Sequence, residues 1–298
     1  MSHVIQRFLE GMLDVLYPPR CMACDSPVEP YRASSLAFAP APTRVLAVPL
    51  ACALAPASTP SLAETPAAEE QNPEYATGFG FCSACSTSLY PVGQACTVCA
   101  EPANAPISVT CSRCRRSAPA FRRVHVSWRY GGELAVALRR LKYGGPGRSG
   151  RLELARPLGM LLAPALDRAI AEAKIDLIVP VPLHPRRLRQ RGFSQALAIV
   201  TAARRVSSIT SLPRIDSGLL VRVRPTAEQA CLGRTARERN VQGAFAVTKA
   251  GSRRLLGKRV LLVDDVLTTG ATAGACARSL LVGGAYSVDV LALARAEN

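Results

Sequence analysis

Two adjacent carboxylates followed by a run of small hydroxyl residues are the segment of this sequence best suited to chemistry. Asp264 and Asp265 follow four branched apolar residues, 260–263. A short loop comes next and contains Thr268, Thr269, Gly270, Ala271 and Thr272. Small hydroxyl residues and free N–H groups at a helix start bind phosphate. Carboxylates repel phosphate but accept hydrogen bonds from sugar hydroxyls, so the pairing predicts a sugar carrying a 5-phosphate, with Mg²⁺ nearby.

The elements around this segment must place it at the edge of a sheet. Residues 260–263 read as a strand buried on both faces of a parallel sheet. A helix is expected from 273 to 282 and is stopped by Gly283 and Gly284. Ligands of open α/β sheets bind at the carboxyl ends of strands, where the two acids would lie. The alternative is an ordinary strand, loop and helix with surface acids. No Gly-Lys-Ser/Thr follows the loop glycine and no Gly-x-Gly-x-x-Gly opens the helix, which argues against a P-loop and a dinucleotide-binding turn.

Cysteines indicate a second kind of chemistry. Eight of the eleven form four Cys-x-x-Cys pairs before residue 120: Cys21/Cys24, Cys82/Cys85, Cys96/Cys99 and Cys111/Cys114. Two residues between thiolates let both reach one tetrahedral Zn²⁺, so four pairs predict a zinc module. A redox role is the rival interpretation, but thioredoxin-like motifs occur singly at a strand-helix junction.

The eight thiolates could close two structural Cys₄ sites, which leave no position for a substrate. The last two pairs resemble a zinc ribbon, and the first two would form the other site. An interleaved pairing stays open, because a stretch rich in Ala, Pro, Ser and Thr, from about 31 to 75, separates the first two pairs. This stretch reads as an insertion without a fixed fold. Cys52 lies within it, outside the pairs.

Charge and hydropathy limit the classes of partner that are expected for this chain. The 298 residues carry 37 Lys and Arg against 21 Asp and Glu, a net charge of +16. That balance favours phosphorylated substrates, nucleic acid or acidic membrane surfaces; a generally basic soluble protein is the alternative. No apolar run reaches the roughly 18 residues of a membrane span. Residues 1–16 read as an amphipathic helix packed on the protein, and we expect the chain to be cytoplasmic.

The second half of the chain reads as a packed domain. Alternation at Val124, Val126, Trp128 and Tyr130 predicts a strand with one buried face. Helices are expected around 134–141 and 154–170, and strands at 176–183 and 288–293. Residues 226–245 fit either a helical hairpin or a mobile lid that shields a reactive centre from water.

A basic segment after the 176–183 strand predicts a second anion site. His184 to Arg191 read as a loop with four arginines: Arg186, Arg187, Arg189 and Arg191. Guanidinium groups are bidentate, permanently charged donors suited to phosphate oxygens. A helix follows, with Ser194 as its N-cap. The alternative is a solvated basic surface.

Several motifs together resemble one known family. These are Tyr17-Pro18-Pro19-Arg20-Cys21, Leu141-Lys142-Tyr143, Pro180-Val181-Pro182-Leu183-His184, Arg189 to Gln195, Arg239-Asn240-Val241 and the acidic segment. The sequence is similar to the ComF family, which joins a double zinc ribbon to a type I phosphoribosyltransferase domain. The resemblance covers nearly the whole chain except 31–75. Ser194 departs from the Asn that the family usually has at this position.

The resemblance implies an α/β fold of the type I phosphoribosyltransferase kind, a parallel sheet flanked by helices after a cysteine-rich zinc module. It implies two domains, 1–120 and 121–298. It also implies a phosphoribosyltransferase that binds phosphoribosyl pyrophosphate (PRPP) with Mg²⁺ and acts in DNA uptake during natural transformation or in use of external DNA. A single-stranded DNA-binding protein regulated by PRPP or a nucleotide is the alternative. Expected partners are PRPP, single-stranded DNA and other DNA-uptake proteins.

By the same resemblance, the acidic pair holds the ribose hydroxyls and the loop from Thr268 to Thr272 holds the 5-phosphate. Arg189 and Arg191 would face pyrophosphate, and the segment with Arg237 and Arg239 would close over it. The expected catalytic residues are therefore Asp264, Asp265, Arg237 and Arg239. The phosphoribosyl acceptor is not given by the resemblance.

Overall fold

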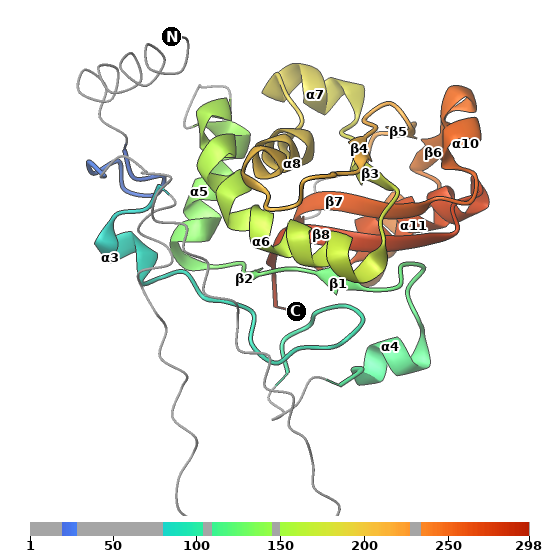
Figure 1. Cartoon of the computed structure of the whole chain (residues 1–298), viewed down its shortest axis with the longest axis horizontal. Coiled ribbons are helices and arrows are strands. Elements are labelled where there is room, and N and C mark those ends of the chain that lie inside the picture. The colour runs from blue at the N-terminus through green and yellow to red at the C-terminus, as the bar shows by residue number, and fades with distance from the viewer. Residues whose placement is uncertain (1–19, 29–79, 104–108, 145–149, 227–233, 298) are drawn as a thin grey trace, which may run out of the picture.

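The computed structural model describes residues 20–28, 80–103, 109–144, 150–226 and 234–297, and Figure 1 shows their arrangement. The expected helix within 1–16, the 31–75 insertion and most of the glycine-rich segment 144–150 lie outside the described residues. The first part of the 226–245 segment does as well. Among the helices that are described, none has the length and apolar character needed to cross a membrane.

A parallel sheet forms the centre of the molecule. Its strand order is β1-β8-β7-β3-β4, with β2 also paired to β8, and every pair is parallel. The strands are β1 Val124–His125, β2 Trp128–Arg129, β3 Leu177–Pro180, β4 Arg214–Ile215, β7 Arg259–Leu267 and β8 Ser287–Arg295. This confirms the predicted α/β fold with a mostly parallel sheet flanked by helices.

Alternate residues of β7 point to opposite faces of the sheet and enter different cores. Leu261 and Val263 pack with α5 Gly132–Tyr143, α6 Ala155–Ala173 and α8 Gln195–Val206. Val260 and Leu262 pack on the other face with α11 Ala271–Val282. Both faces of β7 are therefore buried, which explains its unbroken run of branched apolar residues.

Smaller elements surround this framework. A short 3-10 helix, η2 Leu152–Leu154, precedes α6. Strands β5 Leu220–Arg222 and β6 Phe245–Val247 form an antiparallel pair outside the main sheet. Helix α9 Arg234–Val241 packs against α11, and α10 Lys249–Leu255 follows β6. In Figure 1, β5, β6 and α10 lie beside the end of the sheet that carries β3 and β4.

Strand β7 extends beyond its neighbour β3. Pairing with β3 ends at Pro180 and Val263, whereas pairing with β8 continues to Leu267 and Arg295. The sequence prediction ended this strand at Val263. The structure instead carries it through Asp264 and Asp265, because β8 supplies hydrogen bonds after β3 has ended. Proline has no N–H for a sheet ladder, which suits Pro180 to the end of β3.

The single strand with one buried face that was expected over 124–130 is a wrong prediction. This segment forms two short strands, β1 and β2, and the adjacent residues Val124 and His125 are both buried, so β1 has no exposed face. The edge of β2 is paired instead with residues 90–92: the N–H of Arg129 donates to the Tyr90 carbonyl at 2.7 Å, and the N–H of Val92 donates to the Ser127 carbonyl at 2.8 Å. An edge covered in this way offers no free strand for aggregation.

The basic loop predicted for 184–191 is a helix, α7 Pro185–Arg191. Proline suits the first helical position because its missing N–H would have no intrahelical partner there. His184 caps the helix, as its Nδ1 accepts the N–H of Arg186 at 3.2 Å. Gly192 ends the helix at φ +82°, a left-handed conformation that glycine adopts without strain.

The cysteine-rich segments pack directly on the sheet domain. Cys21 and Cys85 join the core that contains α5 and α6, and the short helix α3 Ser83–Ser86 lies with them. Cys96, Cys99 and Cys114 join the core on the α11 face, together with α4 Ser112–Arg116. The two cysteine groups are therefore continuous with opposite faces of the sheet.

Candidate functional site

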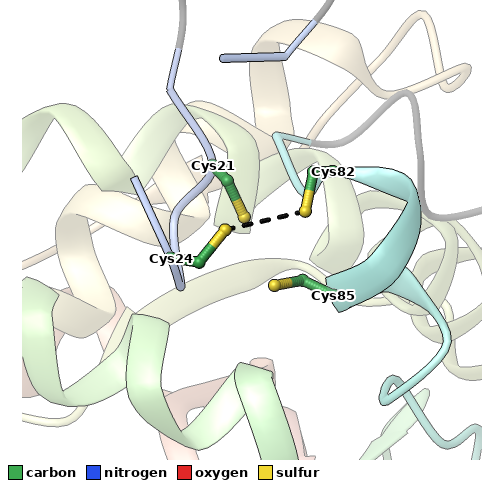
Figure 2. A group of neighbouring side chains, drawn as sticks. All are labelled: Cys21, Cys24, Cys82 and Cys85. Carbon is green, nitrogen blue, oxygen red and sulfur yellow. Dashed lines mark hydrogen bonds between the residues drawn. The ribbon is translucent and has the colours of Figure 1, made fainter. Parts of the chain in front are cut away.

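The eight paired cysteines form two tetrads. The first consists of Cys21, Cys24, Cys82 and Cys85, and the second of Cys96, Cys99, Cys111 and Cys114. Within each tetrad the sulfur atoms lie within 4.8 Å of one another. Figure 2 shows the four side chains of the first tetrad pointing towards a common centre. The structure thus selects the sequential grouping over the interleaved one.

Both tetrads have the dimensions of a tetrahedral thiolate site. With Zn–S bonds of about 2.3 Å, neighbouring sulfurs lie about 3.8 Å apart. The Sγ atoms of Cys24 and Cys82 are 3.6 Å apart, and those of Cys99 and Cys111 are 3.8 Å apart. Four soft sulfur donors suit Zn²⁺ better than hard cations such as Mg²⁺. Either tetrad could therefore bind one metal ion with a closed shell.

The acidic pair lies where β7 has lost its β3 neighbour. The Asp264 side chain accepts a hydrogen bond from the N–H of Asp265, at 2.9 Å to Oδ1. The Asp265 side chain accepts from the N–H of Val266 at 2.9 Å, and its Oδ2 contacts Nζ of Lys142 at 2.5 Å. Only 12% of the Asp265 side chain and 22% of the Lys142 side chain are exposed. An ion pair this enclosed is screened little by salt.

The two carboxyls have opposite pKa shifts. Burial raises the pKa of Asp264 to about 8, and the neighbouring charge of Asp265 adds to that rise. Burial also opposes ionisation of Asp265, but the Lys142 ammonium outweighs it and lowers the pKa of this carboxyl. Although burial favours a neutral amine, the same ion pair raises the pKa of Lys142. One acid is thus held ionised, while the other is held protonated at neutral pH until a ligand supplies positive charge or hydroxyl donors.

The loop after β7 leads into α11 in a geometry suited to an anion. Gly270 precedes the helix with φ +81°, which a side chain would strain. The Thr269 hydroxyl oxygen accepts the N–H of Ala271 at 3.3 Å, within the first turn. Thr268, Thr269 and Gly270 are all partly exposed. N–H groups at a helix start and nearby hydroxyls are the groups that commonly bind phosphate.

Two arginines extend the positive surroundings of the acids. Arg191 lies 4.9 Å from the ring centre of Tyr143, and it donates to the Tyr143 hydroxyl at 2.9 Å and to Gln195 Oε1 at 3.1 Å. Arg222 lies 5.3 Å from the ring centre of Phe245. Burial lowers the pKa of Arg222, and repulsion by the nearby Arg187 adds to this effect, while the charge of Asp264 opposes it. The site therefore presents two acids within a basic rim.

Some predicted residues lie at this site and others lie on adjoining helices. Arg191 is part of the rim, whereas Arg189 is exposed on α7. Arg237 and Arg239 lie on α9, which packs against α11 and ends at the fully buried Val241. The functions expected of these arginines, of the acidic pair and of the loop all stay predictions.

Lys142, Gln195 and Arg222 were not predicted as site residues from the sequence. Lys142 belongs to the Leu141-Lys142-Tyr143 triplet at the end of α5, but nothing in the sequence pairs it with a distant aspartate. Gln195 is 3% exposed and accepts a hydrogen bond from Arg191, and neither its burial nor this contact is readable from the sequence. Arg222 lies on a short strand with no recognisable pattern.

The chain is similar in sequence to several known bacterial proteins. DNA utilization protein YhgH of Salmonella typhi is 32% identical over 220 residues, which cover 73% of this chain and 91% of that protein. The YhgH protein of Escherichia coli K12 is also 32% identical over 220 residues. Competence protein F of Haemophilus influenzae is 28% identical over 189 residues, which cover 62% of this chain and 78% of that protein. No family model matches the sequence.

The chain belongs to the ComF family. The alignment with this chain covers 91% of each of these YhgH proteins, so the relationship extends beyond a single motif. The family resemblance found from the sequence is confirmed.

The opposed pKa shifts of the acidic pair generate a stability prediction. Asp264 has an ordinary pKa of 3.8 and a pKa of about 8 in the folded chain, so between these values the folded state binds the extra proton. The contribution of Asp264 to the free energy of unfolding is therefore largest below pH 3.8, and it is lost progressively as the pH rises to about 8. Asp264→Asn does not ionise, and we expect its melting temperature to exceed that of the parent by more at pH 8.5 than at pH 6.

Asp265→Asn is the matched control. It leaves the Lys142 ammonium without its partner, so it should lower the melting temperature at both pH values. Thermal unfolding monitored by circular dichroism checks both variants. A constant difference between Asp264→Asn and the parent at both pH values would contradict the raised pKa of Asp264.

Proposed function

We propose that the chain binds PRPP at the acidic pair and transfers its phosphoribosyl group. The observation that carries this proposal is the enclosed Asp264-Asp265 pair next to a hydroxyl-rich loop at a helix start. Asp264 and Asp265 would accept hydrogen bonds from the ribose hydroxyls. The loop from Thr268 to Thr272 would hold the 5-phosphate through its hydroxyls and N–H groups. The YhgH and competence protein names do not state this activity.

The basic rim would bind the pyrophosphate end of the ligand. Arg191 already has its guanidinium oriented by Tyr143 and Gln195, so little side-chain freedom remains to be lost on binding. Arg189 and the α9 arginines, Arg237 and Arg239, would approach from adjoining helices. In the proposed reaction the bond between C1′ and pyrophosphate oxygen breaks, and a bond from the acceptor to C1′ forms. Pyrophosphate leaves with the electron pair.

Magnesium fits the same site. Mg²⁺ in proteins is held by one or two carboxylates together with substrate phosphates, and Asp264 and Asp265 provide that donor type. When bound, it neutralises charge on the phosphate groups. Asp264 must be ionised to meet a cation, so its proton would leave on binding.

A role in DNA uptake or use is proposed from the relatives. The names DNA utilization protein and competence protein F support it, and the net charge of +16 agrees with a polyanionic partner. The alternative function is a single-stranded DNA-binding protein for which PRPP or a nucleotide is a regulator. The two functions are compatible, because the acidic pair lies on β7, whereas Arg186 is exposed on α7 and has no part in the proposed PRPP site. Location in the cytoplasm, the division at residue 120 and association with other DNA-uptake proteins stay proposals too.

We propose Zn²⁺ as the metal of both tetrads, because the donor set and sulfur spacing suit it. Purified protein should contain about two zinc ions per chain by elemental analysis. Cys24→Ser and Cys111→Ser should each lower the content by about one, since each removes one of four ligands. Cys52→Ser is the control and should leave the content unchanged. Zinc absent from the parent protein would contradict this assignment.

PRPP binding is tested by calorimetry with Mg²⁺. We expect affinity to rise by up to about tenfold per pH unit between pH 7 and 8, and to level off above the pKa of Asp264. Asp264→Asn should weaken binding by roughly tenfold or more, because hydrogen bonds to charged groups contribute about 1.5–3 kcal/mol. It should also remove the pH dependence. Thr269→Val should weaken binding less, since the backbone donors remain.

A control separates ligand loss from unfolding. Asp289→Asn alters a buried carboxylate on β8 that pairs with Arg122 and His125 away from the acidic pair, so it should bind PRPP normally if folded. Equal affinity of Asp264→Asn and the parent would overturn the proposed ligand site.

DNA binding is tested with a labelled single-stranded oligonucleotide at increasing salt. We expect a steep fall in affinity, because Lys and Arg release counterions from phosphates. The double variant Arg186→Gln, Arg189→Gln removes two exposed charges of α7. It should lower the slope of log affinity against log salt by about 0.7 for each phosphate that the variant no longer neutralises.

Arg205→Gln is the matched control for that experiment. It removes an exposed arginine from the far end of α8, about 15 Å along the helix from Gln195. Its slope should equal that of the parent. A parent affinity that does not change with salt would contradict an electrostatic DNA interface.

A further inference from the structure

A fully buried arginine connects the second cysteine tetrad to the loop after β7. Arg295, the last residue of β8, is 0% exposed. Its guanidinium donates to the Leu267 carbonyl at 3.0 Å and to the Thr268 carbonyl, at the base of the loop. It also donates to the Cys99 carbonyl at 3.1 Å and pairs with Glu101. One buried cation therefore holds the tetrad and the loop together.

A second arginine makes a parallel connection. Arg113 lies between Cys111 and Cys114 and donates to the Cys99 sulfur at 3.0 Å. Its Nη1 is 3.5 Å from the Thr269 carbonyl oxygen, and its Nη2 is 4.0 Å from the Glu101 carboxylate. Glu101 thus contacts both arginines. We refer to Arg113, Glu101 and Arg295 as the arginine bridge.

The arginine bridge contacts the loop and its base through main-chain carbonyl groups. It binds the main-chain carbonyl oxygens of Thr268 and Thr269, which are different groups from the hydroxyls and N–H groups proposed to bind phosphate. Fixing a carbonyl fixes the peptide plane, and so the direction of the next N–H. Burying a guanidinium that lacks hydrogen-bond acceptors is costly, so the buried Arg295 must keep each of its acceptors in place. The bridge therefore depends on the position of the Cys96–Cys99 turn.

We infer that Arg113 and Arg295 are positioning residues through which metal at the second tetrad orders the phosphate-binding loop. This inference rests on the proposed PRPP site. Metal fixes the turn that carries Cys99, the turn fixes the arginine bridge, and the bridge orients the peptide groups of Thr268 and Thr269. Coupling between two binding sites is reciprocal, so PRPP must also stabilise metal at the second tetrad.

The first tetrad provides an internal comparison. Its neighbour Asp25 pairs with Arg140 at 2.9 Å and with Arg151 at 3.2 Å. Within the described residues, the polar and apolar contacts of this tetrad and its turn reach α5, α6 and Arg151 rather than the loop after β7. Metal at the first tetrad should consequently respond less to PRPP than metal at the second, because it is linked to the acidic pair through α5 rather than to the phosphate-binding loop. The same molecule thus contains a strongly and a weakly coupled metal site.

The test is the rate of zinc release to a chromogenic chelator, with and without PRPP and Mg²⁺. Cys24→Ser and Cys111→Ser assign the two release phases to their tetrads. We expect PRPP to slow release from the second tetrad by about fivefold or more, within the usual range of coupling between sites. Release from the first tetrad should change less.

Variants of the bridge separate positioning from general stability. Arg113 is part-exposed, so Arg113→Gln should fold and bind two zinc ions but lose the effect of PRPP on release. Arg113→Lys should restore part of the effect by restoring the charge. Arg151→Gln, beside the first tetrad, should keep the full effect.

The outcomes distinguish this inference from the proposed function. Calorimetry on the same samples reports PRPP binding independently of zinc. Binding with unchanged release from the second tetrad would overturn the coupling and leave the PRPP site intact. Equal slowing at both tetrads, or in Arg113→Gln, would also overturn it. Absence of PRPP binding would refute the proposed site and the coupling with it.

Discussion

The ion pair between Lys142 and Asp265 is the interaction on which the candidate site depends. Two adjacent carboxylates at a partly buried strand end repel each other, and neither is well hydrated. The 2.5 Å contact with Lys142 keeps Asp265 ionised, and Asp264 accommodates the remaining cost through a pKa of about 8. The end of α5 must therefore lie against the end of β7. That requirement is met because α5 and the inner face of β7 share one core.

A site of this kind sacrifices some stability for binding. Sites that keep charged groups close together in a poorly solvated place are stabilised by their ligand rather than by the fold alone. The remaining sheet supports the arrangement: β8 pairs with β7 past the acids, so the strand does not fray where β3 has ended. The loop and α11 follow from a rigid strand end, which limits the freedom lost on ligand binding.

The cysteine tetrads are integrated into both faces of this framework. The first shares a core with α5 and α6, and the second shares one with α11. Phe121 lies in the second core and also near Gly270, where an added Cβ would come within 3.7 Å of its ring. The second tetrad thus adjoins the loop through apolar packing as well as through the arginine bridge.

Local patterns in the sequence predicted much of this structure. The β7–α11 segment, the Ser194 cap and the cysteine pairs are short-range features, and the structure agrees with them except that β7 continues past Val263 to Leu267. The 185–191 helix was missed because its arginines suggested a loop, although Pro185 and Gly192 are ordinary helix boundary signals. Lys142, Arg222 and the arginine bridge depend on contacts between residues distant in the chain, which periodicity and spacing do not encode.

Amide hydrogen exchange with and without PRPP and Mg²⁺ tests the central claim most directly, because it locates the ligand on the chain. We expect PRPP to slow exchange across 264–274, from the acidic pair into the first turn of α11. We also expect Asp264→Asn to lose this protection at the same PRPP concentration. Binding of PRPP with unchanged exchange in 264–274, and protection in some other segment, would contradict the central claim.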